Sequence, residues 1–339
     1  MAGQHGHEPA LKARSVSGKR SERDGNPGRN VTLRRGHLMP SSPHAASFDD
    51  ELTPPFTIVR PQLAATPVVF CSPHSGRIYP RSFLASSRLD ALALRKSEDC
   101  YVDELLQPVA ISGAPMIAAR FPRAFIDVNR EPFELDPELF NEPLPSYANT
   151  QSVRVVGGLG TIARIVSDGE EIYREKIALT EALARIDRLY KPFHSALAGL
   201  LEEARRRCGV AILIDCHSMP SSSIGQPAAA RPDFVLGDRF GASCDGKLTR
   251  YLKEQLASAG YEVHLNRPYA GGFITEHYGR PVRGCHALQI EINRALYLDE
   301  TTLRRSSGFV SLQQDLAKVL GRLVAALPDL FRGRAAAAE

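Results

Sequence analysis

Apolar runs of strand length alternate with stretches of helical period along most of the chain. Strands or extended segments are predicted within 68–76, 115–121, 124–128, 210–215, 233–236, 261–265 and 287–292. Helices are predicted over 87–95, 101–109, 245–259 and 308–326, and a longer one follows a cap at 167–171 and reaches Leu201 with an interruption at Pro192. Strands that alternate with helices predict an α/β fold with a mixed or largely parallel sheet.

Two of the apolar runs end in a histidine. Residues 68–76 read Val-Val-Phe-Cys-Ser-Pro-His-Ser-Gly, and residues 210–218 read Val-Ala-Ile-Leu-Ile-Asp-Cys-His-Ser. The carboxyl ends of strands in an open α/β sheet are where sites form, so His74 and His217 are expected to face one cleft. Neutral imidazole is a good zinc ligand, and a catalytic zinc takes about three protein ligands. The pattern therefore predicts a metal site that needs a third ligand.

A third ligand is available in the acidic segment 97–103, Ser-Glu-Asp-Cys-Tyr-Val-Asp. Asp99 and Asp103 are four residues apart and would share a helix face, whereas Glu98 would point elsewhere. The competing interpretation makes Asp99 a helix cap and Asp103 a solvated acid. The residue two positions before His217, Asp215, would share its strand face and orient its ring.

A carboxylate, Glu291, falls inside the apolar run 287–292. A buried carboxylate needs a partner, because burial without one costs several kcal/mol or raises the pKa. A metal-bound water is one such partner, which suits Glu291 to the role of general base. An ion pair with Arg294 is the alternative.

Two further segments offer groups that would bind a substrate. Residues 129–160 form a long excursion rich in Pro, Asn and Glu. The sequence Phe-Ile-Asp-Val-Asn-Arg leads into it and places Asn129 and Arg130 at the end of a short predicted strand. Arginine matches a carboxylate with a fork of donors, and an ion pair of Arg130 with Glu131 or Glu134 is the alternative interpretation. A glycine-hinged segment, 269–281, carries His277 and Arg280 and is predicted to act as a lid or clamp.

Composition narrows the class of protein. The 339 residues are 43% hydrophobic and 24% charged, as in ordinary globular proteins, and no apolar run is long enough for a membrane span. Of the net charge of +4, residues 1–48 supply +5 from eight basic and three acidic residues, and the remainder is −1. We therefore expect a disordered basic tail over 1–48, one folded domain over 49–332 and a flexible tail over 333–339. Binding of nucleic acid through this basic tail is a less favoured interpretation.

Cysteine usage points to a reducing compartment. The six cysteines show no CxxC pair and no regular spacing, which favours reduced thiols in a cytoplasmic protein. Cys216 adjoins His217, but neighbouring strand residues face opposite ways, so it is predicted to pack in the core. The glycine-rich stretch at 157–162 lacks the Lys-Ser/Thr ending of a phosphate-binding loop, which argues against nucleotide binding.

Taken in order, these motifs resemble the N-formylglutamate amidohydrolase family. The resemblance covers about residues 60–300 and includes Ser-Pro-His-Ser-Gly, Phe-Pro-Arg-Ala-Phe-Ile-Asp-Val-Asn-Arg-Glu-Pro, Asp-Cys-His-Ser-Met, Gly-Gly-Phe-Ile-Thr-Glu-His-Tyr-Gly-Arg-Pro and Ala-Leu-Gln-Ile-Glu-Ile-Asn-Arg. It implies a three-layer, phosphorylase/hydrolase-like fold akin to zinc carboxypeptidases. It also implies hydrolysis of N-formyl-L-glutamate to formate and glutamate in histidine degradation.

The resemblance also implies roles for particular residues. One zinc ion, or another divalent metal, would be held by His74, Asp99 and His217. Glu291 would act as base, and Arg130, with Asn129, His277 and Arg280, would hold a small acidic N-acyl amino acid. The alternatives are a deacylase of another N-acyl amino acid and a catalytically silent ligand-binding protein of the same fold. No oligomeric state is predicted.

Overall fold

The computed structural model describes residues 48–61, 66–166, 169–222 and 231–331, and these belong to one compact unit. The predicted basic tail up to residue 47, the C-terminal tail and the cap residues 167–168 lie outside the described residues. Across the part of the chain that is described, no helix is both long and apolar enough to cross a membrane.

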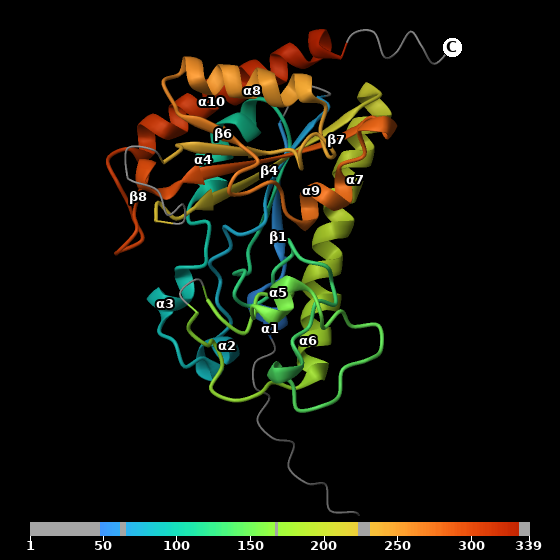
Figure 1. Ribbon diagram of the computed structural model, residues 1–339, viewed down its shortest axis with the longest axis vertical. Coiled ribbons are helices and arrows are strands. Elements are labelled where there is room, and N and C mark those ends of the chain that lie inside the picture. Colours follow the sequence, from blue (N-terminus) through green and yellow to red (C-terminus); the bar gives the residue numbers. More distant parts are fainter. Residues whose placement is uncertain (1–47, 62–65, 167–168, 223–230, 332–339) are drawn as a thin grey trace, which may run out of the picture. The chain divides into compact units, whose positions relative to one another are not determined.

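A mixed sheet of seven strands forms the centre of this unit (Figure 1). Its strand order is β1-β3-β2-β4-β7-β5-β6. The strands β2, β3, β4 and β7 run parallel, while β1 is antiparallel to β3 and β5 is antiparallel to β7. The bounds are β1 Phe56–Val59, β2 Val68–Ser72, β3 Met116–Ala119, β4 Ala211–Met219, β5 Phe234–Gly237, β6 Val263–Leu265 and β7 Cys285–Asn293. After β2 the chain builds β3 on one side and later β4 on the other, so the strand order reverses between β2 and β4, where α/β folds place their ligands.

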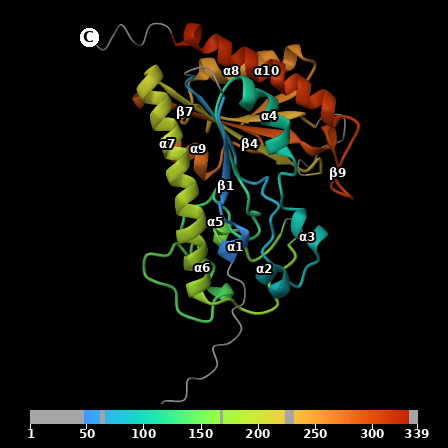
Figure 2. The same ribbon diagram turned by 180° about the vertical axis from the view of Figure 1, so that it is seen from behind.

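Helices cover both faces of the sheet, which confirms the three-layer α/β fold (Figures 1 and 2). On one face, α4 (Val102–Ser112), α8 (Gly246–Ser258) and α10 (Phe309–Leu330) pack on Phe70, Ile214 and Ile290. On the other, α7 (Lys191–Cys208) packs on Val69 and Leu213. Strand residues alternate between the two cores because successive side chains point to opposite faces. Cys216 lies in the first core, as predicted, and all six cysteines, each within the described residues, are free thiols.

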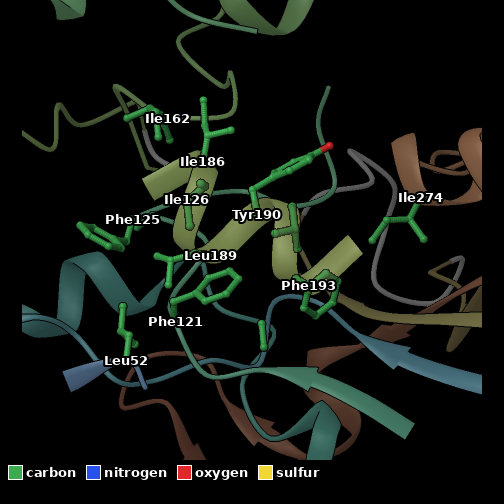
Figure 3. Close-up of a cluster of buried hydrophobic side chains, with 14 of the residues drawn as sticks. Leu52, Phe121, Phe125, Ile126, Ile162, Ile186, Leu189, Tyr190, Phe193 and Ile274 are labelled. Carbon is green, nitrogen blue, oxygen red and sulfur yellow. The ribbon is translucent and has the colours of Figure 1, made fainter. Parts of the chain in front are cut away.

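An irregular region between β3 and α7 packs beside the sheet and is held by a cluster of apolar side chains (Figure 3). Phe121, Phe125 and Ile126 contact the turn of π-helix at Ile186–Tyr190, which directly precedes Pro192 near the start of α7. This agrees with the predicted interruption of the long helix. Remaining elements of the described chain are α1 Phe48–Glu51, α2 Arg81–Ser86, α3 Ala91–Arg95, α5 Val153–Val156, α6 Leu179–Arg185, α9 Phe273–Tyr278, β8 Leu298–Asp299, β9 Arg304–Arg305 and short 3-10 turns at Pro137–Leu139, Pro281–Arg283 and Arg294–Leu296.

Two predicted elements are wrong. The long helix begins only at Leu179, although Ile172 and Ile177 are buried as a helical stripe would be. The backbone there bonds to other segments instead, with Ile172 N donating to Arg164 O at 2.8 Å and Ile177 N to Leu139 O at 3.0 Å. Residues 124–128 form turns and not a strand, because Phe125 N donates to Pro122 O at 2.9 Å.

Candidate metal centre

The carboxyl ends of β2, β4 and β7 bring the predicted groups together. His74 follows the last residue of β2 by two positions, and His217 lies near the end of β4. Glu291 of β7 stands directly beside His217 in the parallel register. The residues that alternate with them, Cys216 and Ile290, point into the opposite core, so one face of these strand ends is polar and the other apolar.

The turn that carries His74 is tightly held. A Cβ at Gly76 would lie 2.0 Å from the carbonyl oxygen of Phe121, so only glycine permits this approach. The backbone N–H of Asp99 donates to the carbonyl of His74 at 3.0 Å. This bond places the segment before α4 against the turn, which is how Asp99 reaches a histidine on another element.

His74, Asp99 and His217 form a buried cluster. Each offers one atom that could bind a metal, and these three atoms lie within 4.8 Å of one another. Asp99 Oδ2 lies 2.9 Å from His217 Nδ1 and 3.3 Å from His74 Nδ1. Burial alone would raise the pKa of Asp99, but hydrogen bonds and charge from His217 and His74 hold it well below its usual range. Asp99 is therefore an ionised carboxylate between two imidazoles.

Each imidazole has a second carboxylate on its far nitrogen. Asp127 Oδ1 lies 2.7 Å from His74 Nε2, and Asp215 Oδ2 lies 3.1 Å from His217 Nε2. Burial opposes ionisation of Asp127, yet the charges of Arg130, Arg123 and His74 lower its pKa well below the usual value. If a cation takes the place of protons between the Nδ1 atoms and Asp99, a carboxylate at Nε2 favours the tautomer with the remaining proton there and turns the Nδ1 lone pair toward the cation.

This set of atoms fits a divalent metal. His74 Nδ1 is buried and has no hydrogen-bond partner among the described residues, so its lone pair is unsatisfied. Burial disfavours a charged His217, but Asp215 and Asp99 outweigh it and raise its pKa well above the ordinary value. A cation between the three side chains would supply the positive charge that the surrounding carboxylates favour. Two imidazoles and a carboxylate form a donor set typical of zinc.

Of the three acids in the predicted ligand segment, only Asp99 reaches the cluster. Glu98 Oε1 accepts from Tyr79 Oη at 2.7 Å and from Arg95, and Asp103 pairs with Arg77 at 3.0 Å. Asp103 also does not share a helix face with Asp99, because α4 begins at Val102.

The buried guanidinium of Arg294 holds Asp99 in place. Its Nη2 lies 3.4 Å from Asp99 Oδ1 and donates to Glu98 O at 2.6 Å, and its Nη1 donates to Lys96 O at 3.0 Å. Ser218 Oγ donates to the same oxygen of Asp99 at 3.1 Å. Arg294 is thus committed to the Asp99 segment and not to Glu291, the partner considered from the sequence.

Glu291 lies at the edge of this cluster and is almost fully buried. Burial raises its pKa to about 7, although the positive charge of His217 opposes the shift. Gln289 Nε2 donates to Glu291 Oε1 at 2.8 Å and fixes the carboxylate. A carboxylate whose pKa lies near neutrality can both accept and release a proton.

A cavity of about 330 Å³ opens beside the cluster and is lined by Arg123, Arg130, His217 and Glu291 among others. Arg130 Nε donates to Leu159 O at 2.9 Å and Nη1 to Asn129 O at 2.8 Å. Arg123 Nη2 donates to Asp127 Oδ2 at 2.8 Å. Both guanidinium groups are therefore held by the protein at the wall of the cavity, where their remaining N–H groups are suited to a carboxylate.

Asn129 borders the cluster itself. Its Nδ2 lies 3.3 Å from His217 Nε2, and its Oδ1 accepts from Ile274 N at 2.8 Å. A Cβ at Gly272 would lie 2.4 Å from Asn129 Nδ2, so glycine at that position permits the approach of the two segments.

The predicted clamp residues lie elsewhere. His277 stacks on Phe273, with ring centroids 5.1 Å apart, and α9 replaces the expected flexible lid. Arg280 pairs through its backbone with Cys285 at the start of β7, six residues before Glu291, and its Nη1 donates to Gly279 O at 2.7 Å. Neither residue lines the cavity beside the cluster.

Sequence reasoning assigned no role to Arg123 and Asp127. Both lie on the turns at 122–127, which carry no periodic signal. Arg123 and Asp127 are four residues apart in a charged segment next to a predicted site, and this spacing could have suggested an ion pair between them. The structure contains that ion pair, at 2.8 Å.

Comparison with known proteins places the chain in a family. The family model for N-formylglutamate amidohydrolase matches residues 66–298. An N-formylglutamate deformylase of Pseudomonas putida is 30% identical over 238 residues, which cover 69% of this chain and 83% of that protein. One from Pseudomonas aeruginosa is 32% identical over 237 residues, with the same shares covered.

The fold agrees with this similarity. The crystal structure of N-formylglutamate amidohydrolase from Ralstonia eutropha JMP134 superposes with a TM-score of 0.77 at 36% sequence identity, and covers 81% of this chain and 99% of that one. The match of sequence and fold extends across β2, β4 and β7 and the segments that carry His74, Asp99, His217 and Glu291. This chain belongs to the N-formylglutamate amidohydrolase family.

Proposed function

We propose that the chain is a metal-dependent amidohydrolase that cleaves the formamide bond of N-formyl-L-glutamate to formate and L-glutamate. The observation that carries the proposal is the buried His74–Asp99–His217 cluster with Glu291 beside it in the sheet register. The names of the relatives in two Pseudomonas species support the substrate. We also propose a place in histidine degradation, as the resemblance of the motifs implies, and in the cytoplasm, as the free cysteines favour.

The metal proposed is one zinc ion held by His74 Nδ1, Asp99 and His217 Nδ1. When bound there, it would lower the pKa of water and offset negative charge on the substrate oxygen. Asp127 Oδ1 lies in hydrogen-bond contact with His74 Nε2 at 2.7 Å, and Asp215 Oδ2 lies 3.1 Å from His217 Nε2. Their charges favour a proton at each Nε2 and would leave both Nδ1 lone pairs for the ion.

Glu291 performs the proton transfers in this proposal. It takes a proton from the attacking water, whose oxygen then bonds to the formyl carbon. The same carboxyl group delivers the proton to the amide nitrogen as the C–N bond breaks, so formate and the free amine leave. A pKa near 7 suits both steps, because neither protonation state is strongly favoured at neutral pH.

Arg130 and Arg123 hold the carboxylates of the substrate. A formyl group offers few contacts, so the orientation of the scissile bond must come from the amino-acid part. The side chain of Arg130 is 13% exposed, and burial lowers its pKa despite the charge of Asp127. A substrate carboxylate that lies against this desolvated guanidinium gains more than it would in water, which favours acidic over neutral N-formyl amino acids.

Formate release from N-formyl-L-glutamate, measured with and without a chelator, tests this function. N-formyl-L-aspartate serves as the comparison with a shorter side chain, and N-formyl-L-glutamine as the comparison with an uncharged side chain. We expect formate release that stops on chelation and returns with zinc, and the weakest turnover for the glutamine derivative. Bound metal without formate release from any of the three would contradict the proposal and favour a silent binding protein.

A further inference from the structure

The cleft at the metal centre consists of two cavities of similar size. The first has a volume of about 330 Å³ and the second about 300 Å³. Both are lined by Arg123, Arg130, His217, Tyr269 and Glu291. The two cavities therefore meet at the group proposed to carry out the hydrolysis. A substrate with its scissile carbonyl at this junction would extend one end into each cavity.

The second cavity is suited to the acidic amino acid. Besides the shared residues it is lined by Asn129, Gln289 and Arg154 of α5. Arg154 Nη1 lies 3.9 Å from Glu134 Oε2, a long and weak ion pair. Its guanidinium is only partly exposed and borders the cavity, so a substrate carboxylate there would have a cation of its own.

The first cavity has an apolar wall. Its lining includes the apolar side chains of Ala124, Leu159, Ala163, Ile165 and Val166, which the second cavity lacks. Of the two cations found only here, Arg294 already donates to Ser218 Oγ, Lys96 O and Glu98 O. The other is Lys96, and the lining of the same cavity also contains the carboxylates of Asp99 and Asp127. This wall matches an alkyl chain better than a carboxylate.

A formyl group would leave the first cavity unused, because its carbonyl carbon carries only a hydrogen. We infer that the cleft accepts longer acyl groups on the same acidic amino acid, so that the chain hydrolyses N-acetyl- to N-butyryl-glutamate as well. This inference rests on the proposed function. The chemistry is unchanged: water oxygen bonds to the acyl carbon, the C–N bond breaks and the amine nitrogen takes the proton.

The test compares kcat/KM for N-formyl-, N-acetyl- and N-butyryl-L-glutamate with the zinc-loaded full chain. One methylene in a hydrophobic pocket changes kcat/KM by about 10- to 200-fold. We therefore expect kcat/KM for the butyryl substrate to match or exceed that for the acetyl substrate, whereas a closed acyl site would lower it by about tenfold or more for each added methylene. Turnover of the formyl substrate alone would overturn the inference and leave the proposed function standing. Turnover of none would count against the proposed function, and with it the inference.

A variant that fills the first cavity gives an independent arm. Leu159→Trp should lower kcat/KM for the butyryl substrate at least about tenfold more than for the formyl substrate. The matched control is Leu84→Trp on α2, since Leu84 and Leu159 are both 39% exposed and Leu84 lies outside both cavities. Equal losses for both substrates in Leu159→Trp would contradict the assignment.

The rival arrangement places one glutamate carboxylate in each cavity, with Lys96 as the partner in the first. It predicts that Lys96→Gln raises KM for N-formylglutamate strongly. Our inference instead expects that effect from Arg154→Gln. A large KM effect at Lys96 with none at Arg154 would overturn it.

Discussion

Asp127 should control how tightly the metal binds, although it is not proposed as a ligand. Its Oδ1 lies 2.7 Å from His74 Nε2, and His74 Nδ1 is one of several buried side-chain atoms with no hydrogen-bond partner among the described residues. Asp127→Asn keeps the shape and an acceptor oxygen but removes the charge that fixes the imidazole tautomer. Loss of such a partner weakens metal affinity by about 10- to 100-fold, or roughly 1.4 to 2.8 kcal/mol.

The assay is the zinc Kd of the wild type and of Asp127→Asn, measured by competition with a chromophoric chelator. Asp136→Asn is the matched control, because Asp136 is also a buried aspartate paired with an arginine, 2.7 Å from Arg164 Nε, and does not line the cavity at the metal centre. The thermal midpoint of each variant separates loss of metal from loss of fold. A zinc Kd for folded Asp127→Asn within about twofold of wild type would refute the tautomer argument.

Three further predictions follow from the same geometry. Glu291→Gln should lower kcat by about 10²- to 10⁴-fold with zinc content unchanged, since it removes the base and leaves the metal ligands in place. Full loss of zinc in this variant would contradict the assignment of Glu291 as a base that does not bind the metal. In the wild type, Glu291 must be ionised to accept a proton, so kcat/KM should fall as the pH drops through about 7. A bound cation would lower the pKa of Glu291 and move this fall to a lower pH. A rise in kcat/KM toward acid pH would count against Glu291 as the base. Gly76→Ala should lower the free energy of unfolding by more than about 2 kcal/mol in urea titrations, because its Cβ would meet Phe121 O, whereas Gly199→Ala in α7, with nothing within 4 Å, should raise it by about 0.5 to 1 kcal/mol.

The parts of the site on regular strands could be predicted from the sequence. His74 and His217 stand at the ends of apolar runs and Glu291 lies near the end of another, and parallel strands bring such ends to one edge of the sheet. Asp215 was found for the same reason, because two residues along a strand restore the same face. The alternation of apolar strands with helical stretches also predicted the α/β fold class.

The parts on irregular backbone could not be placed in this way. Asp127 and Arg123 reach the centre through turns whose path depends on the packing of Phe125 and Ile126 against the π-helical turn before α7 (Figure 3). Residues 172–177 show helical spacing of apolar side chains, but their backbone groups bond to distant segments. Periodicity reports burial, and it cannot report which hydrogen bonds the backbone makes.

His277 and Arg280, the expected substrate clamp, lie outside the lining of both cavities for a related reason. A glycine pair next to charged residues is typical of a mobile loop, yet Gly272 permits close contact with Asn129 and the chain then forms α9. Arg280 lies near the start of β7, at the opposite end of that strand from Glu291. The guanidinium groups that line the cavity beside the cluster include those of Arg130, whose role in carboxylate binding stays a prediction, and Arg123.

The central claim is that His74, Asp99 and His217 hold one metal ion. The most direct test is an anomalous difference map at the zinc absorption edge from crystals of the zinc-loaded protein. The account predicts one peak about 2.0 to 2.2 Å from His74 Nδ1, an Asp99 oxygen and His217 Nδ1. A peak at another position, or an active protein whose map is empty at these three side chains, would contradict it.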